Sequence, residues 1–118
     1  VASEDYTCFV NEETKLPMMY MDDAIKATLQ IMDAPSDQLS IRGGYNLPSL
    51  TFTAGQLYDK IREKLPEFHC EFKPDHRQDY ADSWPDETDG NLSKEDWGYE
   101  LDFDLDSMCD VMIQSLQQ

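Results

Sequence analysis

The sequence is short of basic residues and has no long apolar run. Lys and Arg number 9 against 25 Asp and Glu, which gives a formal net charge of −16 at pH 7. Nucleic-acid phosphates and anionic lipids repel such a surface, so we expect neither nucleic acid nor a membrane as a partner. No apolar run approaches the roughly 20 residues that cross a bilayer, and no signal-peptide pattern opens the sequence. We expect a protein that is not secreted, with mitochondrial and cytoplasmic locations both open.

Paired cysteines are also absent. Cys8, Cys70 and Cys109 are odd in number and form no Cys-x-x-Cys pair. This pattern predicts free or buried thiols in a reducing compartment. His69, Cys70 and His76 are a poor zinc set, because adjacent residues of a strand point to opposite faces. We therefore predict no metal site.

Motifs for nucleotide binding and catalysis are missing as well. The sequence contains no Gly-x-Gly-x-x-Gly, no P-loop and no Tyr-x-x-x-Lys, and no pattern holds a nucleophile against a base. Asp102, Asp104 and Asp106 alternate as in an EF-hand, but Ser107 replaces the required Gly and Ile113 the required Glu. We predict instead that these acids lie at a helix N-terminus, where the helix dipole favours them.

What the sequence does contain is hydrophobic periodicity, which predicts one domain over residues 1–118. Residues 1–14 look irregular. Strands are expected over 16–21, 39–47 and 68–72, helices over 22–34 and 54–65, a helical turn at 93–96, and a last helix beginning at Asp104 or Asp106. This order indicates an α/β or α+β fold.

Local signals mark several helix ends. Asp22 is expected to cap the first helix, which Pro35 ends. The segment Thr53-Ala-Gly-Gln56 matches a capping box. Gly98, directly after Trp97, is expected to turn the chain at a helix C-terminus.

A glycine pair, Gly43-Gly44, interrupts the strand predicted over residues 39–47. Glycine inside a strand marks a bulge or the close approach of another backbone. The sequence leaves both explanations open.

The segment from Lys73 to Pro85 has no long period and concentrates polar and aromatic side chains, namely His76, Arg77, Tyr80, Ser83 and Trp84. Pro85 favours an extended conformation at the residue before it. An indole held beside a guanidinium and carboxylates suits a small polar ligand. The alternative is a surface loop whose Trp fills the core.

Three blocks, in order along the chain, together resemble one known family. They are Tyr6-Thr-Cys-Phe with residues 14–28 (Thr-Lys-Leu-Pro-Met-Met-Tyr-Met and onward), Arg42-Gly-Gly-Tyr-Asn with Phe52-Thr53, and Pro74-Asp-His-Arg-Gln with Ala81-Asp-Ser-Trp-Pro85. Asp96-Trp-Gly98 and the closing helix follow the same pattern. The chain resembles the C-terminal part of short-chain-dehydrogenase-type L-threonine 3-dehydrogenases, in the extended epimerase/dehydratase-like group.

This resemblance implies that separate parts of the enzyme have separate roles. In such enzymes a Rossmann domain binds NAD, a Tyr and Lys pair moves protons, and a C-terminal lobe closes the pocket for L-threonine, which is oxidised to 2-amino-3-ketobutyrate. It implies that this chain is the substrate-side portion of an extended Rossmann-type dehydrogenase, lacking the nucleotide-binding half that holds NAD. That half and, in the full enzyme, a second subunit of a homodimer would be its partners.

The resemblance also implies site residues. Trp84 corresponds to the position that touches threonine, with Arg77 and Asp82 as supports of the pocket, and no catalytic residue falls within the chain. After Pro85 the family carries a second Asp and an Ala, where this chain has a different sequence over residues 86–92. Two hypotheses remain: a dehydrogenase segment that is inactive alone, or a free-standing acidic binding domain derived from the same lobe.

Overall fold

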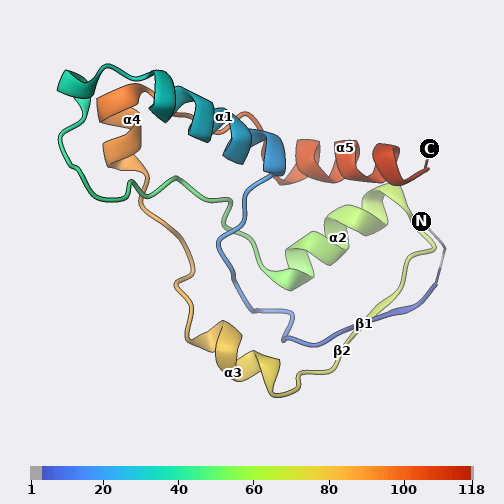
Figure 1. Cartoon of the computed structure of the whole chain (residues 1–118). Helices are drawn as coiled ribbons and strands as arrows, with labels where there is room; N and C mark the ends of the chain where they lie inside the picture. The colour runs from blue at the N-terminus through green and yellow to red at the C-terminus, as the bar shows by residue number, and fades with distance from the viewer. Residues whose placement is uncertain (1–3, 118) are drawn as a thin grey trace.

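Short helices joined by long irregular connections dominate the computed structural model, which describes residues 4–117 (Figure 1). The elements, in chain order, are β1 (Tyr6–Cys8), α1 (Met21–Asp33), the 3-10 turn η1 (Ser36–Gln38), α2 (Ala54–Lys64), β2 (Cys70–Phe72), α3 (Arg77–Asp82), α4 (Asn91–Trp97) and α5 (Leu105–Gln117). The mixed α/β class predicted from the sequence is confirmed.

The two strands form a parallel pair, with Tyr6 opposite Cys70 and Cys8 opposite Phe72. The expectation of an irregular stretch over residues 1–14 is therefore wrong for β1, while residues 1–3 lie outside the described chain. Three residues are too few to show an alternation, and the pairing partner is more than 60 residues away. The strand predicted over 68–72 is confirmed in its second half.

Two other predicted strands are wrong. Residues 16–20 contribute only an isolated antiparallel bridge between Met18 and Leu50, next to Pro17, which has no N–H to donate, and Met21 begins α1. Residues 39–47 form no regular element within the described chain and run as a stretched connection beneath α1 (Figure 1). An apolar strand pattern is not sufficient without a neighbouring strand to pair with.

Helix α1 begins one residue before the predicted helix and ends at Asp33, two residues before Pro35. The predicted N-cap is wrong, because Tyr20 occupies that position without a side-chain cap. The next aspartate, Asp23, is the important one. It is 1% exposed, and its carboxylate accepts N–H groups from Asp102 and Phe103, each at 3.0 Å.

Helix α2 has the predicted capping box. The N–H of Gln56 donates to the Thr53 hydroxyl at 3.0 Å, and the N–H of Thr53 donates to the Gln56 side chain at 2.8 Å. Both donors would otherwise be unpaired at the first turn of the helix.

Replacing Thr53 with alanine should lower the free energy of unfolding by about 1 kcal/mol, because one of these donors loses its acceptor. Urea unfolding followed by circular dichroism measures the change. Thr51→Ala is the matched control, since Thr51 is exposed and lies before the cap. An equal loss in both variants would contradict the assigned cap.

The predicted ends of α4 and α5 are also confirmed. Gly98 ends α4 with a φ of 72°, in the left-handed region that glycine adopts without strain. Asp104 precedes α5 and accepts the N–H of Ser107 at 2.8 Å. That hydrogen bond from the Ser107 backbone is the main cause that lowers the pKa of the Asp104 carboxyl. The acidic run thus lies at a helix N-terminus, as expected.

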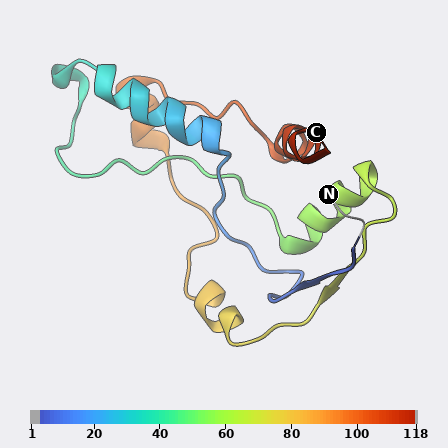
Figure 2. The ribbon, with the colours of Figure 1, turned by 45° about the vertical axis from the view of Figure 1, so that its right-hand side comes forward.

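Packing between elements is sparse. Helix α2 packs on α5, with ion pairs from Lys60 to Asp106 at 3.0 Å and from Lys64 to Asp110 at 2.5 Å. The molecule measures 52 × 35 × 16 Å and has a radius of gyration of 16.9 Å. A compact domain of this length would have a radius of about 13.5 Å. By these dimensions the chain is a thin layer. The rotated view shows that α3 and the two strands lie apart from α1 (Figure 2).

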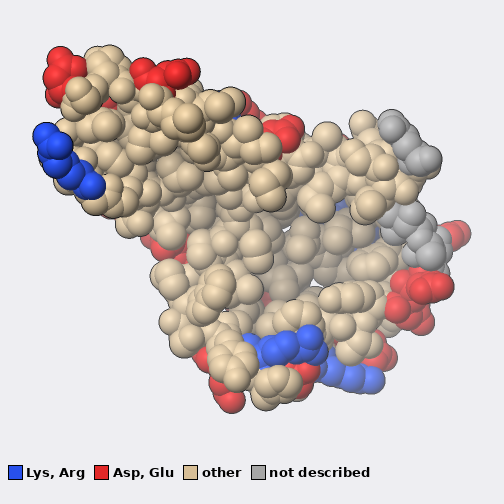
Figure 3. Space-filling model, in the orientation of Figure 1, with Lys and Arg blue, Asp and Glu red and all other residues tan. Residues whose placement is uncertain are grey.

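The charge is unevenly distributed over this layer. On the face shown in Figure 3 the charged side chains lie mainly at the margins, while much of α1 and α5 presents uncharged surface. None of the helices within residues 4–117 is long and apolar enough to cross a membrane.

Candidate functional site

The predicted site segment is not irregular throughout, since it contains the six-residue helix α3. Asp75 organises its start: its carboxylate accepts the N–H of Arg77 at 2.9 Å, and its carbonyl accepts the N–H of Gln78 at 2.9 Å. Less than two turns of helix are too short to show a hydrophobic period, which is why the sequence did not predict α3.

Arg77 pairs with a neighbour in sequence. Its Nη2 donates to Asp75 Oδ2 at 2.6 Å, and its guanidinium carbon lies 3.6 Å from the centre of the Phe9 ring. Hydrogen bonds from Arg77 are the main cause that lowers the pKa of Asp75 to about 2. The guanidinium thus fastens the beginning of α3 to the residue that follows β1.

Asp82 is held by Gln78, a residue to which sequence reasoning assigned no role. The Gln78 Nε2 donates to Asp82 Oδ1 at 2.6 Å and to the Thr14 hydroxyl at 3.0 Å. Its Oε1 accepts the backbone N–H of Asn11 at 2.7 Å. Gln78 therefore joins α3 to the segment after β1 and orients one oxygen of Asp82. Its only signal in the sequence was its place at the end of the Pro74-Asp-His-Arg-Gln block.

A polar hollow of about 270 Å³ lies where these two segments meet. Asn11, Glu13 and Thr14 line one side, and Gln78, Ala81 and Asp82 are among those on the other. Neither Arg77 nor Trp84 lines it. The structure thus places Asp82 at the hollow and leaves the other two predicted residues outside.

Trp84 lies just past the end of α3 and is 60% exposed. Its backbone N–H donates to the Ala81 carbonyl at 3.2 Å. Within residues 4–117 its indole makes no ring or hydrogen-bond contact. The alternative that this Trp fills the core is therefore wrong. Its contact with a ligand stays a prediction.

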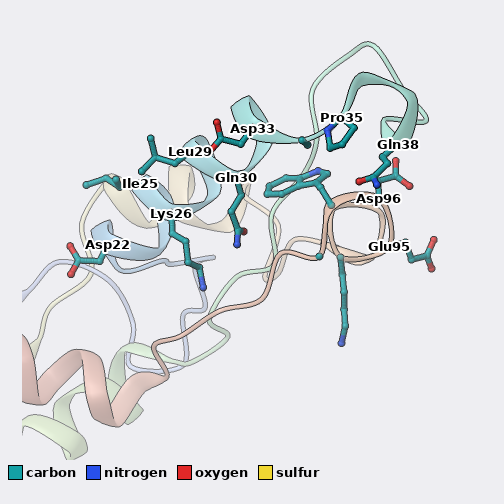
Figure 4. Close-up of a pocket in the computed structure, with 14 residues that line it drawn as sticks. Asp22, Ile25, Lys26, Leu29, Gln30, Asp33, Pro35, Gln38, Glu95 and Asp96 are labelled. Atoms are coloured by element: carbon teal, nitrogen blue, oxygen red, sulfur yellow. The ribbon is translucent and has the colours of Figure 1, made fainter.

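A larger open hollow of about 960 Å³ separates α1 from α4 (Figure 4). Asp22, Lys26, Gln30 and Asp96 are among its lining residues. In the close-up, Ile25 and Leu29 point to the opposite side of α1 from Lys26 and Gln30. None of the predicted site residues lies here.

The described residues offer no further reactive group. The three thiols are unpaired, and burial raises the pKa of both Cys70 and Cys109, which disfavours the nucleophilic thiolate. Within the described range, no cluster of three or more His, Cys, Asp or Glu side chains could hold a metal ion. The side chains described at the polar hollow offer hydrogen-bond donors and acceptors.

No family model matches the sequence. Individual proteins similar to it are L-threonine dehydrogenases and epimerase/dehydratases. The mitochondrial L-threonine 3-dehydrogenase of Sus scrofa is 41% identical over 109 residues, which are 92% of this chain and 29% of that protein. An uncharacterized epimerase/dehydratase of Staphylococcus haemolyticus is 39% identical over 114 residues, which are 96% of this chain and 36% of that protein.

Solved structures similar to this chain are also L-threonine dehydrogenases. The holo form of the GalE-like L-threonine dehydrogenase from Cupriavidus necator superposes with a TM-score of 0.95 at 45% identity, covering 98% of this chain and 38% of that one. A monomeric L-threonine 3-dehydrogenase of metagenomic origin gives 0.91 at 48% identity, covering 96% and 36%. The chain thus spans well under half of the proteins it matches. In sequence and in structure, it is related to one part of the GalE-like L-threonine 3-dehydrogenases and of the epimerase/dehydratases similar to them.

Proposed function

We propose that this chain is the C-terminal, substrate-side segment of an NAD-dependent L-threonine 3-dehydrogenase. The observation that carries the proposal is the match over nearly the whole chain, at 45% identity and a TM-score of 0.95, to a protein described as an L-threonine dehydrogenase. The reaction would convert L-threonine to 2-amino-3-ketobutyrate. The rival, a free-standing binding domain, has less support because the layer is thin and few apolar side chains are buried.

The residues of this chain do not fit NAD. Dinucleotide phosphates need a glycine-rich turn leading into a helix N-terminus, and the sequence has no such motif. NAD would be held by another segment of the complete enzyme. The isolated chain should therefore be inactive.

The site suits the amino-acid end of the reaction. The polar hollow presents an Asp82 oxygen that Gln78 orients, and a carboxylate in that position can accept hydrogen bonds from an ammonium group. The exposed indole of Trp84 offers a flat wall close to the end of the same helix. In this proposal Asp82 and Trp84 orient threonine, while Arg77 positions α3 through Asp75 and Phe9.

Replacing Trp84 with phenylalanine should lower kcat/KM for threonine by about tenfold or more, because a displaced substrate loses alignment for the reaction. The measurement uses a chimera in which this chain replaces the matching segment of the Cupriavidus necator enzyme. Tyr6→Phe is the control, since Tyr6 is an exposed aromatic residue on β1. If Trp84→Phe keeps the full kcat/KM, Trp84 has no part in the pocket.

A further inference from the structure

Gln78 lies one helical turn before Asp82 on α3 and is half-buried against the segment that follows β1. Its Nε2 donates to Asp82 Oδ1 at 2.6 Å and to the Thr14 hydroxyl at 3.0 Å. Its Oε1 accepts the Asn11 N–H at 2.7 Å. One amide therefore binds a neighbour on its own helix and two residues that are 64 and 67 positions away in the sequence.

The orientation of this amide is fixed by partners that cannot be exchanged. A backbone N–H only donates, so the end of the amide that faces Asn11 must be the oxygen. An ionised carboxylate only accepts, so the end that faces Asp82 must be the nitrogen. Glutamate has no donor for Asp82, and lysine has no acceptor for Asn11. Among polar side chains of similar length, a neutral amide meets both requirements.

The Asp82 carboxylate has one oxygen bound and one oxygen open. Among residues 4–117, Oδ2 accepts no hydrogen bond, and no Lys, Arg or His pairs with this carboxylate. The other charged residues at the polar hollow, which are Glu13, Lys15 and Asp86, make no ion pair with it in the described part of the chain. A carboxylate that is held by a neutral donor and lacks a cation is available to a cationic group of a ligand.

The position of Asp82 depends on the loop across the hollow. The Thr14 N–H donates to the Asn11 carbonyl at 3.1 Å, and the Thr14 carbonyl accepts the Ala54 N–H at 3.0 Å, at the start of α2. Both residues of this loop that Gln78 contacts are thus fixed themselves. An exposed aspartate otherwise samples several side-chain rotamers. Gln78 selects the one that is anchored to the loop.

We propose that Gln78 is a positioning residue for substrate binding, which holds the Asp82 carboxylate toward the ammonium group of the amino acid. This inference rests on the proposed function and adds to it the residue that orients Asp82. Gln78 acts through Asp82, because both ends of its amide are already bonded within the chain. The ammonium group is present in threonine and in its 3-keto product. Its binding should therefore affect KM and leave kcat nearly unchanged.

A double-mutant cycle in the Cupriavidus necator chimera tests this role. Gln78→Met and Asp82→Ala should each raise KM for L-threonine at least about tenfold, with kcat within about twofold of the unmodified chimera. The double variant should be no worse than Asp82→Ala alone, because Gln78 then has no carboxylate to orient. Independent roles would multiply to a rise of about 100-fold, and that result would overturn the inference.

Gln114→Met is the matched control. Gln114 is exposed on α5, and its side chain makes no hydrogen bond within the described range. Its replacement should leave KM and Tm unchanged, and a rise in KM equal to that of Gln78→Met would contradict the role of Gln78. If Gln78→Met lowers Tm and leaves KM unchanged, Gln78 is only structural and the inference is wrong.

Thr14→Val gives the same test in case Gln78→Met does not fold. Valine keeps the shape of threonine and removes the hydroxyl to which Gln78 Nε2 donates. KM should rise about threefold, because Gln78 loses one of its anchors. There should be no further rise in the presence of Asp82→Ala. A rise that persists beside Asp82→Ala would overturn the inference.

The outcomes separate this inference from the proposed function. A folded chimera that does not oxidise threonine would refute the proposed function, and this inference with it. An active chimera in which Gln78→Met and Thr14→Val keep the unmodified KM would refute the role of Gln78 alone.

Discussion

Trp97→Ala should lower the free energy of unfolding by about 3 kcal/mol, because a large side chain is removed from a packed aromatic cluster. The Trp97 ring lies 6.0 Å from the Tyr45 ring and 5.5 Å from the Tyr99 ring. Tyr99 is fully buried. Trp97 is the last residue of α4, so its indole also packs this helix against the connection that carries Tyr45. Domains of ordinary stability have about 5–15 kcal/mol in total, so the loss is severe.

The other tryptophan is the matched control. Trp84→Ala removes the same side chain from an exposed position without ring contacts, so its effect should stay within about 0.5 kcal/mol. Urea titration of both variants beside the parent chain gives the comparison. Equal losses, or a larger loss for Trp84→Ala, would contradict the division between a tryptophan of the fold and one of the site.

The second large effect is expected for Asp23→Ala, at about 3 kcal/mol, because two N–H groups lose a charged acceptor. These donors belong to Asp102 and Phe103, at the entry to α5. Asp23 also accepts the Tyr99 hydroxyl at its carbonyl, at 3.0 Å, and burial is the main cause that raises the pKa of Tyr99 to about 12. One aspartate thus ties the first turn of α1 to the segment before the last helix.

Asp22→Ala is the control for this prediction. Asp22 is adjacent, has the same charge and lies exposed in the first turn of α1. Its loss removes only a favourable interaction with the helix dipole, of about 0.5 kcal/mol. Thermal unfolding of both variants measures the difference. Similar melting temperatures would show that the carboxylate of Asp23 does not hold the α5 entry.

The sequence predicted those features whose determinants lie within a few residues of one another. The Thr53 and Gln56 cap, the Gly98 turn and the start of the last helix in the acidic run are all local, and the structure contains each of them. Local hydrogen-bond geometry depends on few neighbours, which is why these features could be predicted. The Asp22 cap was also a local prediction and is wrong, because Tyr20 occupies the N-cap position of α1.

Features that depend on distant partners were missed or wrong. Strand β1 exists because β2 lies beside it, and residues 39–47 have no such neighbour among residues 4–117. At the candidate site, the contact between Gln78 and Asn11 joins residues 67 positions apart. No spacing rule finds such a pair. The exposure of Trp84 excludes the core-filling alternative, and its contact with a ligand stays a prediction.

Threonine-dependent reduction of NAD by the Cupriavidus necator chimera is the most direct test of the proposed function. We expect the chimera to form NADH at a rate within about tenfold of the parent enzyme. For the isolated chain we expect neither NADH formation nor NAD binding by calorimetry. A folded chimera that reduces no NAD with L-threonine would contradict the assignment, as would NAD binding of about micromolar Kd by these 118 residues alone.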